Sequence, residues 1–227
     1  MNHSPFKKSF LFASAILCIA ACFTDLVLIY LFGNQIPGFN QLTSTLSSLG
    51  VSTSPVAVEV TVWSIILGFI FIFFAFGFRV VFQKLGKETV YAFWLILFYA
   101  LGEDIASGVF RADSINGKLT GLAYLHDLLG GIGVTALLLL PYFMQKIFTG
   151  FSFPLFNRYS RIAWLVGIIA TIFFSFRLEY FSGTFLYKYS GLWQRIFLVD
   201  YYIYFIVIAF MIMKEADYIH SKSHYNL

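Results

Sequence analysis

The sequence predicts an all-α membrane protein, a single bundle of six transmembrane helices formed by residues 1–227. The first reason is composition: 59% of the residues are hydrophobic and 11% are charged, whereas soluble domains carry about 25% charged residues. The second is a series of six apolar runs separated by Gly, Pro, Ser or charged residues. The third is the uneven distribution of Lys and Arg among the connections. This composition excludes a water-soluble domain, a disordered chain and a disulfide scaffold.

Each apolar run is long enough for a helix to cross roughly 30 Å of hydrocarbon, which takes about 20 residues. The predicted spans are residues 10–32, 58–82, 89–110, 122–148, 159–176 and 192–213. We interpret the first as an uncleaved span, because its apolar run continues past Cys22 to Leu31. Residues 214–227 are predicted to form a polar cytoplasmic tail that extends the last helix.

The basic residues predict the orientation of the bundle. Ten of the 15 Lys and Arg residues fall on one side of the predicted spans and five on the other. The positive-inside rule puts the side with ten in the cytoplasm, together with both termini. An even number of spans agrees, since the chain must then end on the side where it starts. The net charge of +4 is therefore expected to reflect topology and not binding of nucleic acid.

The longest connection, residues 33–57, is predicted to lie on the outer side. It is too apolar for a simple linker, and Leu42, Leu46 and Leu49 recur at i, i+4 and i+7. This spacing predicts a short amphipathic helix that lies on the membrane surface or caps the bundle.

Most acidic residues fall in the outer half of the predicted spans or in the outer loops. They are Asp25, Glu59, Glu103, Asp104, Asp113, Asp127, Glu179 and Asp200. At 1.5 Å per residue, Asp25 and Asp200 lie roughly 10 to 12 Å below the outer boundary. A charge near the bilayer centre costs about 2.5 to 3.5 kcal/mol on insertion scales, so such residues usually face a partner or a wet cavity. We expect a polar pocket that opens to the outer face.

Two predicted helices supply the floor of this pocket. Glu103 and Ser107 lie at i and i+4, on one helix face. His126 shares a face with Gly130 and Gly133, and residues this small let helices approach closely. The complete set of predicted ligand-binding residues is Glu103, Asp104, Ser107, His126, Asp127, Gln194, Arg195, Asp25 and Asp200.

Gln194 and Arg195 begin the last predicted span at the outer interface. Arg195 is expected to neutralise two of the carboxylates. Arg177 and Glu179 are interpreted as ordinary interfacial anchors or ion pairs.

These residue types leave two kinds of chemistry open. A carboxylate and a neutral imidazole suit one divalent metal ion, with Glu103, His126 and Asp127 as candidate ligands. The same three residues are candidate catalytic groups, an acid/base set acting on a lipid or isoprenoid. The other histidines fall on the predicted cytoplasmic side, which weakens a zinc hydrolase. The sequence has no nucleophile elbow, zinc-protease pair or phosphate-binding loop, and no polar path through the cytoplasmic half to indicate a channel.

Four segments, taken in order and spacing, carry a family resemblance. They are Leu46–Gly50 with Ser54-Pro55, Gly102–Asp104 through Ser107-Gly108 to Phe110 and Asp113, His126–Gly130, and Gly191–Arg195. With these segments the chain resembles the uncharacterised prokaryotic membrane proteins catalogued as domain of unknown function 998, over nearly its whole length. The resemblance implies a helical bundle of about six spans in a prokaryotic cytoplasmic (inner) membrane, and it implies no activity.

The function predicted from the sequence is binding. An outward-facing pocket of acidic residues and one histidine is expected to hold a cation or the head group of a lipid-like ligand. One alternative is a membrane-embedded enzyme, metal-dependent or acid/base, that acts on a lipid or isoprenoid. The other is a structural or accessory membrane protein whose polar layer is an ion-pair network. The expected partners are membrane lipid and a small amphiphilic ligand.

Overall fold

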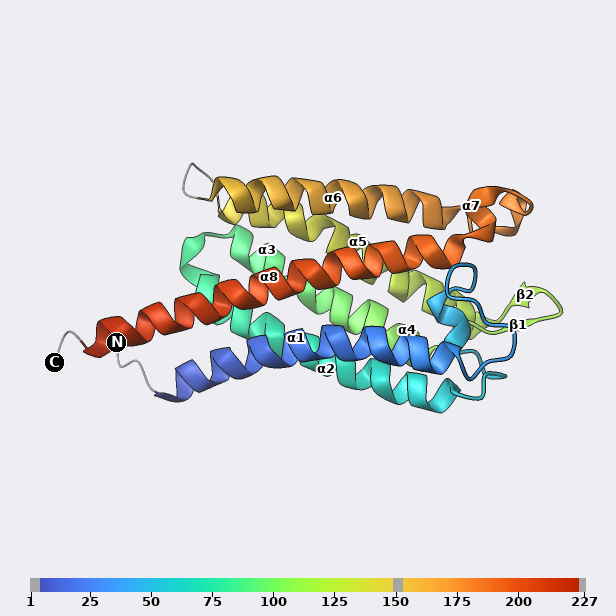
Figure 1. Cartoon of the computed structure of the whole chain (residues 1–227), viewed down its shortest axis with the longest axis horizontal. Coiled ribbons are helices and arrows are strands. Elements are labelled where there is room, and N and C mark those ends of the chain that lie inside the picture. Colours follow the sequence, from blue (N-terminus) through green and yellow to red (C-terminus); the bar gives the residue numbers. More distant parts are fainter. Residues whose placement is uncertain (1–4, 149–152, 225–227) are drawn as a thin grey trace.

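The computed structural model describes residues 5–148 and 153–224. Its long helices lie side by side along one axis (Figure 1). In chain order the elements are α1 Pro5–Gly33, the 3-10 helix η1 Leu46–Leu49, α2 Ala57–Phe82, η2 Gln83–Leu85, α3 Glu88–Tyr99, the π-helix η3 Ala100–Ala106, α4 Ser107–Val109, β1 Ser114–Ile115, β2 Lys118–Leu119, α5 Gly121–Ile147, α6 Pro154–Ser175, η4 Glu179–Phe181, α7 Phe185–Lys188 and α8 Ser190–His224.

Five of the described helices are long and apolar enough to cross a membrane. They are Phe6–Gly33, Ala57–Leu85, Glu88–Val109, Gly121–Ile147 and Ser190–Ala216. The chain is therefore a multi-pass, α-helical membrane protein. The remaining predicted span, residues 159–176, lies mainly in α6, a helix of 22 residues that packs beside α5 and α8. Two basic residues, Arg158 and Arg161, lie in its first turns.

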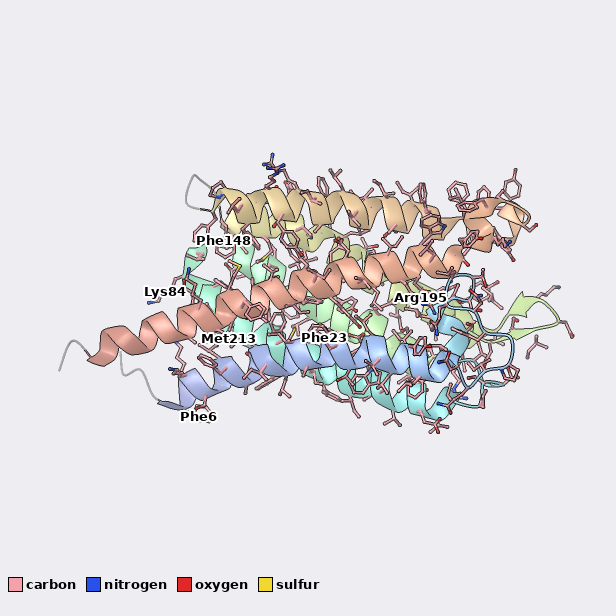
Figure 2. The ribbon with its side chains drawn as sticks, in the orientation of Figure 1. Phe6, Phe23, Lys84, Phe148, Arg195 and Met213 are labelled. Carbon is pink, nitrogen blue, oxygen red and sulfur yellow. The ribbon has the colours of Figure 1, made fainter. Side chains whose placement is uncertain are left out.

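Aromatic rings fill the centre of the bundle. Phe71 of α2, Tyr99 of α3 and Phe205 of α8 are fully buried. The ring centroids of Phe71 and Phe205 are 4.9 Å apart, and those of Phe71 and Tyr99 are 5.5 Å apart. Other large apolar side chains, such as Phe23 of α1, point away from the bundle (Figure 2). Apolar residues on all sides of a helix are typical of helices surrounded by lipid.

The rod that contains α3 is not a regular α-helix. It continues from α3 through the π-helix η3 into α4 without a break. The span predicted over residues 89–110 coincides with this rod, Glu88–Val109. The π-helical segment within it was not predicted, because a π-helix pairs residues five apart and has no simple sequence signal. Such segments are rare and often lie at functional sites. Glu103 and Asp104 both lie in η3.

The two ends of the bundle differ. Helix α1 begins and helix α8 ends at the same end of the bundle, which we call the terminal end (Figure 1). Lys84 lies toward the terminal end and Arg195 toward the opposite end (Figure 2). We call that opposite end the hairpin end, because it carries the two short strands β1 and β2. The turn between these strands is Asn116-Gly117, with φ of 52° and 76°, and Asn-Gly is the residue pair that favours such tight hairpin turns.

The connection between α1 and α2 covers the hairpin end. Within it, η1 is a single 3-10 turn, Leu46–Leu49, and not the amphipathic helix beginning near Leu42 that the spacing predicts. Leu49 is buried, whereas Leu42 is exposed. Residues 34–45 instead form a series of turns, and the carbonyl oxygens of Leu42, Thr43 and Ser44 accept hydrogen bonds from the start of α8. Contacts with α8 therefore outweigh the helical spacing of the leucines.

Candidate functional site

The π-helix carries two neighbouring carboxyl groups, and it places the first, Glu103, against α5. A Cβ atom added to Gly133 would lie 2.6 Å from the backbone nitrogen of Glu103, and one added to Gly130 would lie 2.8 Å from its Oε2. The predicted glycine face of α5 therefore holds Glu103 at close range. Asp104, the next residue, is 5% exposed. The Ser107 hydroxyl donates to the backbone carbonyl of Glu103 and leaves its carboxyl free.

A third carboxyl group has partners on two other helices. Asp25 of α1 is 6% exposed. Its Oδ1 accepts a hydrogen bond from Trp63 Nε1 of α2 at 2.7 Å, and its Oδ2 accepts one from the Tyr202 hydroxyl of α8, also at 2.7 Å. Asp25 thus joins three helices. Sequence reasoning missed both partners, since nothing in the spacing of a single helix identifies a donor on another.

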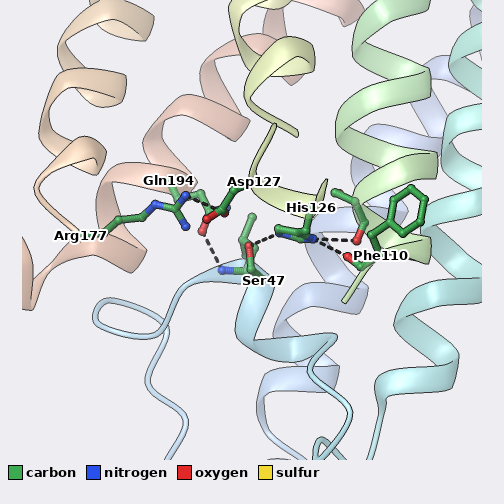
Figure 3. Close-up of polar contacts among 8 residues, drawn as sticks. Ser47, Phe110, His126, Asp127, Arg177 and Gln194 are labelled. Carbon is green, nitrogen blue, oxygen red and sulfur yellow. Dashed lines mark hydrogen bonds and ion pairs between the residues drawn. The ribbon is translucent and has the colours of Figure 1, made fainter. Parts of the chain in front are cut away.

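His126 of α5 bonds to the end of α4, the last segment of the rod that begins with α3. The Thr120 side chain caps α5 by accepting from Ala123 N at 3.2 Å, and this fixes where the helix begins. His126 Nδ1 then lies 2.9 Å from the carbonyl oxygen of Ser107 and 2.8 Å from that of Phe110 (Figure 3). Carbonyl oxygens can only accept, so Nδ1 carries a proton and donates to both.

The other nitrogen of His126 reaches the first connection. Nε2 lies 3.0 Å from the Ser47 hydroxyl, which donates to it when the ring is neutral. Both ring nitrogens are therefore engaged in positioning contacts, and neither bonds to Glu103. This arrangement does not support a preassembled acid/base pair between His126 and Glu103.

Asp127 lies beside His126 but faces α6. Its Oδ1 accepts from Arg177 Nη2 at 2.9 Å, and the two side chains are 35% and 32% exposed (Figure 3). The Arg177 guanidinium also lies 4.7 Å from the centre of the Phe174 ring. The interpretation of Arg177 as part of an interfacial ion pair agrees with this contact, and Asp127 is its partner.

Gln194 and Arg195 attach the first connection to α8. Gln194 Oε1 accepts from the backbone nitrogen of Leu46 at 2.7 Å (Figure 3). Arg195 Nη1 donates to the carbonyl oxygen of Ser44 at 2.8 Å, and its Nη2 to Gln41 Oε1 at 2.9 Å. The expectation that Arg195 neutralises two carboxylates is wrong, because its guanidinium bonds to amide and carbonyl oxygens. Its role here is to hold the connection in place.

A further contact ties the connection to the hairpin. Asp113 accepts from the Ser52 backbone nitrogen at 2.7 Å and from the Ser52 hydroxyl at 2.6 Å. These hydrogen bonds, the one from the hydroxyl first, hold the pKa of Asp113 below its usual range. Arg111 Nη1 lies 3.4 Å from the same hydroxyl.

Two cavities lie beneath the connection between α1 and α2. The smaller, of about 110 Å³, lies within the hairpin-end half of the bundle. Its polar lining includes Asp25, Trp63, Glu103, Asp104, Ser107, His126 and Gln194. The larger, of about 250 Å³, lies between α5, α6 and the start of α8, and its lining includes Glu103, His126, Asp127, Arg177 and Gln194. Glu103, His126 and Gln194 therefore border both cavities.

Two of the predicted site residues lie elsewhere. Arg195 and Asp200 line neither of these cavities. Asp200 lies deeper along α8, and its Oδ2 is buried without a hydrogen-bond partner among the described residues. The remaining seven predicted ligand-binding residues line one cavity or both. Ser47 also borders both cavities and was found only through the resemblance to Leu46–Gly50.

The donor set does not favour a metal ion. Within the described ranges, no group of three or more His, Cys, Asp or Glu residues is arranged to hold one. His126 and Asp127 are neighbours in sequence, but His126 faces Ser47 whereas Asp127 faces Arg177. A site made of Glu103, His126 and Asp127 would require both contacts to break.

Comparison with known proteins gives one match. A family model described as "Protein of unknown function (DUF998)" matches residues 19–211, which is most of the chain. No curated protein and no solved structure matches. The matched region contains α2 to α7, most of α1 and the part of α8 that contacts the two cavities.

Proposed function

The chain belongs to this DUF998 family, and from that premise we propose that it is a binding protein of a prokaryotic cytoplasmic membrane, whose two cavities hold a lipid-like ligand by its polar head. In this proposal six helices, α6 included, cross the bilayer. The terminal end faces the cytoplasm, because most of the basic residues lie in its connections. The pocket then belongs to the outer half of the membrane.

The Glu103 carboxyl group is the observation that carries the proposal. It borders both cavities, and among the described residues it forms no hydrogen bond or ion pair. Burying a polar group without a partner costs several kcal/mol in an apolar medium. A ligand that supplies a donor or a positive charge at this point would offset that cost, which is the usual basis of a polar contact in an otherwise apolar pocket.

The larger cavity supports a ligand with an apolar part. Val134, Phe174 and Phe197 form apolar walls beside the polar groups. Gly131 and Thr135 of α5 border the same cavity and are exposed on the outside of the bundle. A lipid chain can therefore enter between α5 and α6 from the bilayer while the connection between α1 and α2 stays in place.

Ligand retention tests the proposal with a matched pair of variants. Glu103→Gln and Asp200→Asn each convert a carboxyl group within the predicted spans into an amide, and Asp200 lines neither cavity. Native mass spectrometry of the protein in nanodiscs is expected to show a bound amphiphile in wild type and in Asp200→Asn, and its loss in Glu103→Gln. Equal retention of the amphiphile in all three proteins would show that Glu103 does not bind it.

Elemental analysis separates a lipid head group from a metal ion. The geometry favours the head group, so wild type and His126→Ala, both purified without added metal, are expected to contain equally little zinc, manganese or iron. Near-stoichiometric metal that is lost in His126→Ala would contradict this preference. Such a result would favour the metal-dependent alternative and a search for turnover of lipids.

A further inference from the structure

We infer that the smaller cavity binds a primary ammonium group, held between the carboxyl groups of Glu103 and Asp104. The inference rests on the proposed function and deepens it, since it names the chemical class of the head group. An amine-headed amphiphile would place its ammonium in the smaller cavity and its chain in the larger one.

Asp104 supplies the first step of the argument. Its side chain is nineteen-twentieths buried and lines the smaller cavity. Its Oδ2 has no hydrogen-bond partner in the part of the chain that the structure describes. The great majority of buried polar side-chain atoms in proteins have a partner. A group this deep, without one and next to a cavity, indicates that the partner comes from outside the chain.

The groups beside Asp104 indicate the sign of the charge on that partner. Glu103 and Asp104 are consecutive residues and line the same cavity. Asp25 lines it too, but its two acceptor atoms are taken by Trp63 and Tyr202. A site with two free carboxyl groups attracts a cation, because a positive charge between them offsets the cost of burying both.

The basic residues that border the cavities already have partners. Arg111 lines the smaller cavity, and its Nη1 points to the Ser52 hydroxyl at 3.4 Å. Arg177 lines the larger cavity, and its Nη2 bonds to Asp127 at 2.9 Å. Neither residue is bonded to Glu103 or Asp104. Arg177 is near enough to attract Glu103 electrostatically, but its hydrogen bond goes to Asp127. A ligand is therefore the proposed source of a cation that bonds to Glu103 and Asp104 directly.

The size and lining of the cavity favour an ammonium group. A volume of about 110 Å³ suits the head of a small amine. An ammonium group has three donors and no acceptor. The two carboxyl groups can take these donors, with the lone pairs of the Ser47 or Ser107 hydroxyls beside them. A divalent ion would need more ligands of fixed geometry than this lining presents.

Two probes that differ only in their head groups test the inference on the unaltered protein. Dodecylamine and dodecanol have the same chain, and nanodiscs of phosphatidylcholine contain no competing primary amine. Dodecylamine is expected to bind at least about tenfold more tightly than dodecanol, since charge-assisted hydrogen bonds are stronger than neutral ones. Equal affinity for the two probes would overturn the ammonium inference while leaving amphiphile binding intact.

Variants locate the bound head group. Asp104→Asn and Glu103→Gln are each expected to weaken dodecylamine binding by about tenfold or more and to leave dodecanol binding unchanged. Asp200→Asn should bind both probes as wild type does. Unchanged dodecylamine binding in Asp104→Asn would overturn the assignment to the smaller cavity.

Ethylamine separates a lipid from a free amine. It carries the same ammonium group without a chain, so weak binding of ethylamine beside tight binding of dodecylamine supports an amphiphile. Ethylamine that binds as tightly as dodecylamine would overturn the proposed lipid-like ligand and leave the ammonium site standing. Absence of binding by either amine would overturn the ammonium inference, whatever lipid is retained.

Discussion

Carboxyl groups line the smaller cavity, in the hairpin-end half of the bundle, at two places, and their hydrogen bonding differs. Asp25 receives two hydrogen bonds of 2.7 Å, from Trp63 and Tyr202. Glu103 and Asp104, which line the same cavity, receive none from the described residues. Position in the cavity lining therefore does not by itself distinguish a structural carboxyl group from a candidate functional one. The two places differ in whether the chain supplies hydrogen-bond donors to the carboxyl group.

The difference follows from the elements that carry the two places. Asp25 lies on a regular α-helix. The indole of Trp63 and the phenol of Tyr202 both donate hydrogen bonds to it. Glu103 and Asp104 lie on a π-helix, and Glu103 packs against Gly130 and Gly133, which have no side chain to donate. The first place is complete within the chain, whereas the second receives no hydrogen bond from the described residues, and we propose that a ligand supplies it.

The largest expected effect is at Asp25. Asp25→Ala leaves the Trp63 indole and the Tyr202 hydroxyl buried without an acceptor, and each unsatisfied donor costs about 1–3 kcal/mol. We expect the free energy of unfolding in detergent micelles to fall by more than about 2 kcal/mol. Glu103→Gln and Asp104→Asn break no such contact, so they should unfold at or above the wild-type denaturant concentration. A loss of stability in these two variants as large as in Asp25→Ala would erase the contrast between the two places.

The next effect concerns the packing that places Glu103. In Gly133→Ala the new Cβ would lie 2.6 Å from Glu103 N and 2.9 Å from Glu103 Cβ. The two helices must then separate, and such overpacking costs about 1–3 kcal/mol. Gly131→Ala is the matched control, since its Cβ meets nothing within 4 Å and alanine favours a helix by up to about 1 kcal/mol. The two unfolding midpoints should move in opposite directions, and equal shifts would contradict the close packing of η3 on α5.

A smaller effect is expected at the ion pair between Asp127 and Arg177. Both side chains are about one-third exposed, and exposed pairs contribute about 0.2–1 kcal/mol. A double-mutant cycle of Asp127→Asn and Arg177→Gln measures the coupling. A coupling above about 2 kcal/mol would exceed the range of exposed pairs, and it would make this pair a structural contact like that of Asp25.

The smallest effect is a pH dependence at the surface. Asp113 resembles Asp25 in accepting two hydrogen bonds, but it is only partly buried, and those bonds lower its pKa. Their contribution to stability is present above the unfolded-state pKa of about 3.9 and is lost as the pH falls through the folded-state pKa. Once exchange is corrected for its intrinsic pH dependence, protection of the Ser52 amide should fall below about pH 4. In Asp113→Asn this step should be absent, and a step that persists would assign it to another group.

Periodicity and hydropathy predict the features that depend on one helix at a time. The six apolar runs coincide with long helices, and the glycine face of Gly130 and Gly133 does meet Glu103. The Glu103–Ser107 spacing also brings the two residues together, although the contact is from hydroxyl to backbone. These predictions succeed because the pattern of one helix determines which residues share a face.

Features that depend on two distant segments could not be predicted in the same way. The donors to Asp25 come from two other helices, and the π-helix at Glu103 has no sequence pattern of its own. Arg195 shows the limit most clearly. Its charge suggests carboxylate partners, but oxygen atoms of the first connection reach it instead. The Asn116-Gly117 pair is a missed signal, since it identifies a hairpin turn without any knowledge of the fold.

The connection between α1 and α2, which covers the cavities, also determines when the pocket can form during synthesis. Gln41 is 154 residues before Arg195, and Leu46 is 148 residues before Gln194. During synthesis, α1 and its connection leave the ribosome long before their fastening points on α8 exist. The pocket can therefore be completed only when the last helix inserts. If the pocket binds a ligand as proposed, an unfinished chain lacks the complete site, and ligand occupancy would report that α8 has inserted.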